Sequence, residues 1–101
     1  MKVRFKDGVV KDCTAPTEQK IFKSVDGKTG WMLMLRLIGE ITSTELDNIL
    51  TTNNIATLEF FSEDNIPLFT LDGYDKITSS TIRHSEDTTS TSVEIQLTKG
   101  V

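Results

Sequence analysis

The sequence predicts an α+β fold that is mainly β: an antiparallel meander that forms a small barrel or a two-sheet sandwich, with one short helix at about residues 43–52. Two observations support this fold class. Several short runs rich in β-branched and aromatic residues are separated by Gly, Asp and Asn turns, which favours hairpins. Only one segment has helical periodicity, and a fold built from parallel βαβ units would need several helices. The 101 residues are expected to form a single domain, 1–101.

The most apolar stretch, Trp31–Ile41, is predicted to be a central strand. Side chains of a strand alternate between its two faces. The odd positions from Trp31 to Leu37 are all apolar, so one face should be buried in the core. The other face is mixed, because a single charged residue interrupts three apolar ones. This second face comprises Met32, Met34, Arg36 and Ile38.

Two turns near the N-terminus predict hairpins. Asp7-Gly8 lies between two β-prone runs, and glycine tolerates the positive φ of a type I′ turn. A two-residue turn there would place Phe5 opposite Val10. The loop at residues 26–30 should join a strand at residues 18–25 to the central strand in the same way.

The helix is predicted from its start signal and its apolar stripe. Thr42 and Glu45 have the spacing of a capping box, in which each side chain satisfies the other residue's backbone N–H. Leu46, Ile49 and Leu50 then fall on one helical face.

The remainder of the chain predicts four more strands, near residues 55–61, 66–71, 74–84 and 93–98. Pro67 has no backbone N–H, so its strand should lie at a sheet edge or start there. In the last strand Val93, Ile95 and Leu97 alternate with polar residues, which indicates one buried face and one solvated face.

Composition and charge favour an ordinary soluble protein. No segment resembles a signal peptide and there is one cysteine, so a cytoplasmic protein without disulfides is expected. The net charge of −4 argues against nucleic acid as the main partner. Residues 1–36 carry eight Lys/Arg against four Asp/Glu (+4), and residues 37–101 carry three against eleven (−8). This split either supports a head-to-tail contact between copies or is neutralised within one fold.

Catalytic, cofactor-binding and metal-binding residues are not predicted, and no cofactor is expected. Cys13 and His84 would be a nucleophile–base pair only if the fold brought them together. His84 with Glu86 and Asp87 has no recognised ligand spacing.

An oligonucleotide-binding barrel is the competing interpretation of the basic N-terminal part. Aromatic side chains would stack on bases and cationic side chains would contact phosphates. The acidic second half instead favours aromatic residues in the core and solvated lysines, so nucleic acid is not the expected partner. The residues concerned are Phe5, Phe22 and Trp31 with Lys2, Arg4, Lys20 and Lys23.

Three segments of the chain resemble a known class of proteins. They are the opening segment Met1–Gly8, the segment Leu71–Ile77 with the Ser/Thr-rich run after it, and the terminal segment Val93–Lys99. In general character the chain resembles the small β-rich, Thr-rich accessory proteins of tailed phages and prophages. The resemblance implies a structural protein of a phage tail or baseplate, without catalytic residues, and a virion-associated location as the alternative to the cytoplasm. It rests on no diagnostic motif and identifies no site residues.

Two functional hypotheses result. The first is a non-enzymatic structural or assembly protein, phage- or prophage-tail related, that acts through protein–protein contacts including self-association. The alternative is a small barrel-type binding module for single-stranded nucleic acid or a small ligand. No membrane association is expected, because the apolar run is too short to span a bilayer. The candidate partner surface comprises Met32, Met34, Arg36, Glu94 and Gln96.

Overall fold

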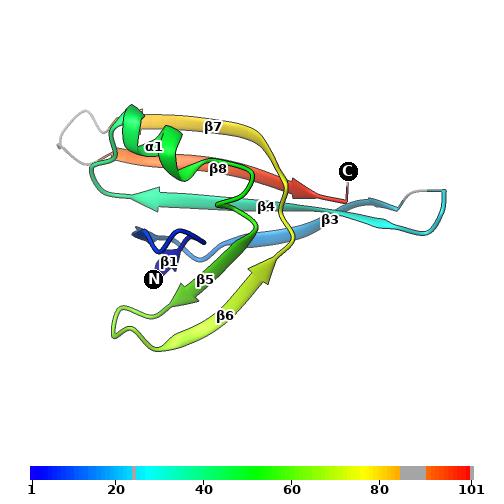
Figure 1. Ribbon diagram of the computed structural model, residues 1–101, viewed down its shortest axis with the longest axis horizontal. Coiled ribbons are helices and arrows are strands. Elements are labelled where there is room, and N and C mark those ends of the chain that lie inside the picture. Colours follow the sequence, from blue (N-terminus) through cyan, green and yellow to red (C-terminus); the bar gives the residue numbers. More distant parts are fainter. Residues whose placement is uncertain (24, 85–90, 101) are drawn as a thin grey trace.

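The computed structural model describes residues 1–23, 25–84 and 91–100, and the side chains within these ranges except at positions 22, 23, 83, 84 and 91. The element order confirms the predicted sequence of four strands, one helix and four strands (Figure 1). The elements are β1 (Lys2–Arg4), β2 (Val10–Cys13), β3 (Thr17–Lys23), β4 (Thr29–Ile38), α1 (Ser43–Ile49), β5 (Thr57–Phe61), β6 (Pro67–Asp72), β7 (Lys76–His84) and β8 (Thr91–Lys99).

All the described strands belong to one antiparallel eight-stranded sheet, which confirms the predicted antiparallel, mainly β fold class. Its order is β6-β5-β1-β2-β4-β8-β7, with β3 also paired to β4. The neighbours are not all consecutive in sequence, because β5 lies beside β1 and β8 lies beside β4. Figure 1 shows the β5–β6 hairpin angled away from β4, β8 and β7, while the β3–β4 hairpin extends beyond the other strands.

Strand β4 is central, as its sequence predicted, but it spans Thr29–Ile38, so the predicted end at Ile41 is wrong. β8 pairs with it from Trp31 to Ile38 along one edge. Along the other edge β3 pairs with its first part and β2 with its last part. The short segment between β2 and β3 still follows β4, since the Thr14 N–H donates to the Arg36 carbonyl at 3.0 Å. Pro16 lies in this interruption, where its missing N–H breaks no ladder bond.

The first hairpin differs from its prediction by one residue. Arg4 pairs with Val10, and the Phe5 N–H donates to the Val9 carbonyl at 2.9 Å, so the expected pairing of Phe5 with Val10 is wrong. The loop has three residues instead of two and ends in Gly8, whose φ is +96°. A type I turn followed by a left-handed glycine is the usual three-residue hairpin, and Asp-Gly is compatible with either length.

Helix α1 starts where predicted and ends earlier. Thr42 Oγ1 accepts from the Glu45 N–H at 3.1 Å, which confirms the N-cap. The backbone of Leu50 is no longer helical (φ −87°, ψ 70°), so the helix ends at Ile49 rather than near residue 52. The Asn54 side chain donates to the Ile49 carbonyl at 2.9 Å and satisfies this end of the helix. No described helix has the length and apolar character needed to cross a membrane.

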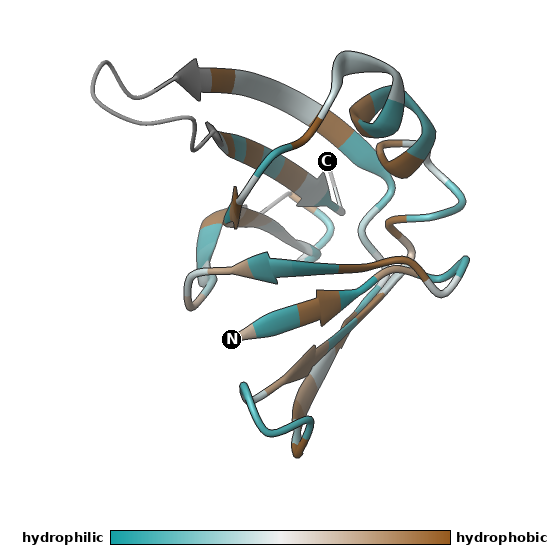
Figure 2. Cartoon of the chain, turned by 90° about the vertical axis from the view of Figure 1, so that its left-hand side faces the viewer, coloured by the Kyte–Doolittle hydropathy of each residue, from teal (hydrophilic) through white to brown (hydrophobic). Residues whose placement is uncertain are grey.

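The core lies on one side of the sheet, which we call the inner face, and α1 contributes to it. Figure 2 shows the sheet curving around this interior. From β4 the inner face receives Leu33, Leu35 and Leu37, all buried. From α1 it receives Leu46 and Ile49. The remaining buried apolar residues are Val3, Phe5, Cys13, Ile41, Ile55, Leu58, Phe60, Tyr74, Val93, Ile95 and Leu97.

Tyr74 closes the interior where β6 passes into β7. These two strands are consecutive in sequence but lie at opposite ends of the sheet order. The buried Tyr74 ring lies under Lys99 Nζ, 4.6 Å from the ring centroid, and its hydroxyl donates to Glu18 Oε2. Burial, followed by the neighbouring Glu18 carboxylate, raises the pKa of Tyr74 well above its usual value. This cluster therefore connects β3, β8 and the β6–β7 connection.

Candidate protein-docking face

The side of the sheet opposite the core, which we call the outer face, carries the even positions of β4. Antiparallel pairing aligns each of them with residues of the neighbouring strands. Met34 lies between Thr17 of β3 and Gln96 of β8, and Arg36 lies beside Glu94 of β8. The register of β7 extends these rows to Ser79, opposite Gln96, and to Thr81, opposite Glu94.

This outer face is open in the part of the chain that the structure describes. The side chain of Met34 is 44% exposed and that of Ile38 is 43% exposed. Arg36 is also exposed, while Met32 is half-buried. Helix α1 places its apolar residues in the core, so it does not cover these positions. The central strand is therefore both a core element and an accessible surface.

A shallow depression of about 230 Å³ lies on this face. It brings together four of the five candidate partner-surface residues, namely Met34, Arg36, Glu94 and Gln96. Met32 is not part of its lining, because it lies on the next row towards the β3–β4 hairpin tip, opposite Thr98. We call this set the β4–β8 docking face: Thr14, Ala15, Thr17, Met34, Arg36, Ser79, Thr81, Glu94 and Gln96.

The two walls of this depression were not predicted from the sequence. One wall is the interruption between β2 and β3, and the other is the Ser/Thr-rich strand β7. A bulge between Ile77 and Ser79 changes the register of β7, and the Thr78 hydroxyl donates to the Gln96 carbonyl at 3.1 Å. The Ser/Thr-rich composition of residues 78–81 does indicate that this strand is solvated, and it is the sequence feature that points to this wall.

Two charged side chains of the docking face are paired with each other. Arg36 Nη2 donates to Glu94 Oε1, so the strong charges of β4 and β8 form an ion pair across adjacent strands. An exposed pair of this kind contributes little to stability. The pair places a positive and a negative group beside the apolar side chain of Met34. Such a surface can make polar and apolar contacts with the same partner.

The oppositely charged parts of the chain form ion pairs with each other inside the fold. Four side-chain ion pairs among the described residues join the segment 1–36 to the remainder. They are Arg4 with Glu59, Lys11 with Glu45, Arg36 with Glu94, and Lys99 with Glu18 at 3.9 Å. The split therefore gives no independent support to a head-to-tail contact.

The thiol of Cys13 is a core group. Its residue is 4% exposed, and burial raises its pKa to about 11, which suppresses the reactive thiolate. β2 is separated from β7 by β4 and β8, so the fold does not bring the backbone of Cys13 next to that of His84. The His84 side chain, Glu86 and Asp87 lie outside the described residues. Within the described ranges, no cluster of His, Cys, Asp and Glu is suited to hold a metal ion.

The aromatic residues of the oligonucleotide-binding interpretation do not form one platform. Phe5 is 2% exposed and belongs to the core. Trp31 lies elsewhere, near the start of β4, paired with Lys20 of β3 and with Lys99 of β8. Arg4 Nη2 forms an ion pair with Glu59 Oε2 at 2.6 Å. The side chain of Phe22 lies outside the described residues.

Comparison with known proteins identifies no relative of this chain. No protein-family model matches it, and neither the curated proteins nor the solved structures give a significant match.

Proposed function

We propose that this protein is a structural protein that works through protein–protein contacts, and that the β4–β8 docking face receives its partner. The observation that supports the proposal is the outer face of β4, where Met34 and Ile38 are each more than two-fifths exposed around the Arg36–Glu94 pair. Met and Arg are enriched in the cores of protein interfaces. Methionine in addition adapts its shape to a partner surface.

The partner that suits this face is a protein with a protruding apolar residue. The depression is shallow, and its two walls carry threonine and serine hydroxyls beside the apolar side chain of Met34. Such a surface offers a hydrophobic contact at its centre and hydrogen bonds at its rim. It lacks the enclosed apolar cavity typical of a small-molecule site.

We further propose that the assembly is a phage or prophage tail or baseplate. This part of the proposal is supported by the resemblance in size, β content and Thr-rich character to the accessory proteins of tailed phages.

The test is incorporation into particles. Tagged variants would be expressed in the source strain, and phage-like particles released by induction would be purified and analysed by quantitative mass spectrometry. Wild-type protein should be present at a fixed copy number. Met34→Glu should reduce incorporation at least tenfold, because it places a charge at the centre of the face.

Val10→Glu is the matched control. Val10 is an apolar strand residue of β2 with 48% exposure, close to that of Met34, and it lies outside the docking face. It should leave incorporation unchanged. Particles that contain no copies of the wild-type protein would contradict the tail assignment, and equal incorporation of Met34→Glu would contradict the role of this face.

A further inference from the structure

Strand β6 is an apolar edge that the fold leaves open. It ends the sheet order, so within the described chain only β5 pairs with it. Ile66 is 58% exposed, Leu68 48% and Phe69 41%. In Figure 2 hydrophobic residues occur along the hairpin at the bottom of the view, which β5 and β6 form. Exposed apolar edge strands pair readily with another strand.

The backbone pattern shows which groups of β6 face the open edge. The Gly73 N–H donates to the Ala56 carbonyl at 2.9 Å, so this pair is hydrogen-bonded. In an antiparallel ladder hydrogen-bonded and non-hydrogen-bonded pairs alternate. Leu71 and Phe69 therefore direct their backbone groups towards β5, and Thr70 directs its N–H and C=O away from the sheet.

Both ends of this edge are blocked, which limits pairing to a short window. Pro67 has no N–H to donate. At the other end, the Asp72 carbonyl accepts from Lys99 Nζ at 2.8 Å. Only the segment 68–71 remains, with the outward-facing backbone groups of Thr70 near its centre. A window this short suits one closed contact rather than continuous strand addition.

We propose that two copies of this chain associate through their β6 edges, antiparallel and about a two-fold axis at Thr70. In this register Thr70 faces Thr70 of the second copy and exchanges two backbone hydrogen bonds with it. Phe69 faces Leu71 of the second copy on the inner face, and Leu71 faces its Phe69. Threonine pairs and aromatic–aliphatic pairs are favourable cross-strand neighbours. The contact is isologous, so it closes as a dimer.

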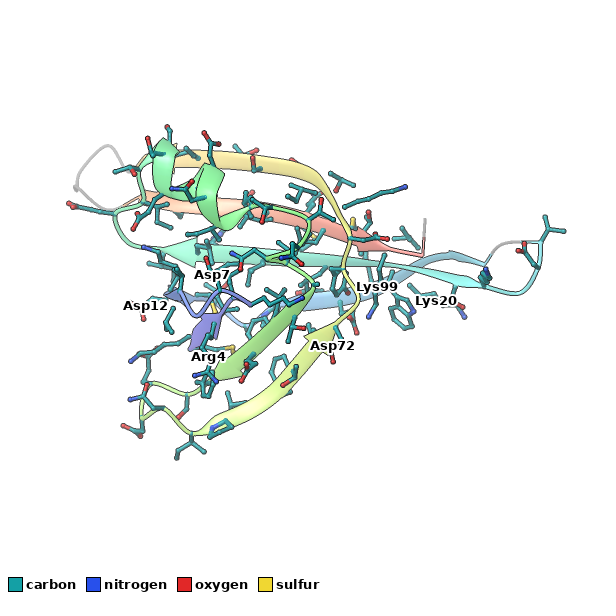
Figure 3. All side chains as sticks on the ribbon, viewed as in Figure 1. Arg4, Asp7, Asp12, Lys20, Asp72 and Lys99 are labelled. Carbon is teal, nitrogen blue, oxygen red and sulfur yellow. The ribbon has the colours of Figure 1, made fainter. Side chains whose placement is uncertain are left out.

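Charge complementarity selects a second copy as the occupant. The pairing window carries no charged side chain, so two copies meet without repulsion. Asp72 is the last residue of β6, as Figure 3 shows. At the other end Lys2 lies on the row of Phe61 and Pro67, with its Nζ 3.4 Å from Asn65 Oδ1. The two-fold axis brings each Asp72 to the end where Lys2 of the other copy lies.

The Phe69 ring is already held in the position that this contact requires. It stacks on the buried Phe60 ring, with centroids 4.7 Å apart and planes inclined by 19°. One side of Phe69 is therefore fixed against the core, while the residue as a whole stays 41% exposed. Little side-chain entropy remains to be lost when Leu71 of the second copy covers it.

The test is a cysteine placed on the two-fold axis, in the background Cys13→Ala. Paired Cα atoms in a hydrogen-bonded antiparallel pair are about 5.5 Å apart, within disulfide range. Thr70→Cys should therefore form a disulfide-linked dimer under mild oxidation. Asp72→Cys, two residues from the axis on the same strand, should link at least tenfold more slowly. Equal rates at the two positions would overturn the proposed register.

Sedimentation of the isolated, uncrosslinked chain tests the association itself. The wild type should show a reversible dimer, and Thr70→Pro should raise the dimer Kd at least tenfold by removing the central N–H donors. Thr70→Val keeps the N–H and should dimerise like wild type. If Thr70→Pro fails to fold, Phe69→Asp replaces it, with the same expectation. A strict monomer at high concentration would overturn the inference and leave the β4–β8 docking face untouched.

Discussion

The two faces of β4 are made from the same ten residues but have opposite roles. On the inner face Leu33, Leu35 and Leu37 are at most 2% exposed. On the outer face Met34, Arg36 and Ile38 are exposed, although two of the three are apolar. Hydrophobicity alone therefore does not decide burial here. The decisive factor is that α1 and the curvature of the sheet cover one side only.

The largest expected contrast is between truncations on these two faces. Leu35→Ala should destabilise the protein by about 3 kcal/mol, because it leaves a cavity in a packed core. Met34→Ala should change the free energy of unfolding by less than about 0.5 kcal/mol, since its side chain loses few contacts. Urea denaturation of both variants would measure this difference. Equal losses would mean that the outer face is covered in the isolated chain.

A second prediction concerns the closure of the inner face. Tyr74→Phe removes the hydroxyl that donates to Glu18 and should cost about 1–2 kcal/mol, because the lost bond has a carboxylate acceptor. The ring and its contact with Lys99 are kept. Glu18→Gln retains an acceptor and should cost less when both variants are compared by thermal unfolding. A neutral Tyr74→Phe would show that ring burial alone closes the interior.

A third prediction concerns a buried hydroxyl on the outer side. Thr98 is 4% exposed, and its Oγ1 has no hydrogen-bond partner in the described part of the protein. Thr98→Val replaces this hydroxyl with a methyl group and should stabilise the fold by roughly 1 kcal/mol. Thr81→Val, at an exposed position of β7, should have little effect. Destabilisation by Thr98→Val would indicate that a solvent molecule satisfies the hydroxyl.

The smallest effect under neutral conditions concerns Cys13. Its pKa is raised from 9.0 to about 11, so the folded state retains the thiol proton where the unfolded state loses it. The stability that burial of the neutral thiol provides is complete below pH 9 and declines as the pH rises towards 11. Wild type should therefore lose more stability than Cys13→Ala across this interval, as measured by urea midpoints. Identical pH profiles would contradict the burial of the thiol.

The sequence predicted those features that depend on neighbouring residues. Alternation identified β4 and β8, the Thr42–Glu45 spacing identified the start of α1, and Pro67 identified an edge strand. Pairings between distant segments were not predictable in this way. Strand β5 lies beside β1 although more than fifty residues separate Arg4 from Glu59. Likewise, Asp7-Gly8 is compatible with a two- or a three-residue loop, and this left the register of the first hairpin open.

The candidate site was predicted only in part for the same reason. The parity of β4 and β8 placed Met34, Arg36, Glu94 and Gln96 on one surface. The walls of the depression depend on the bulge in β7 and on the break between β2 and β3. Both are set by long-range packing, and neither leaves a periodic signal in the sequence. The open edge of β6 was indicated by Pro67, while its apolar exposure required the sheet order.

In the proposed assembly, a protein partner covers the outer face of β4. Methionine oxidation by dilute peroxide, followed by mass spectrometry, measures this directly, with the isolated protein and purified particles as the two samples. Met34 should oxidise readily in the isolated chain and should be protected at least tenfold in particles, while the half-buried Met32 should change less. Equal oxidation of Met34 in both samples would contradict the proposed docking face.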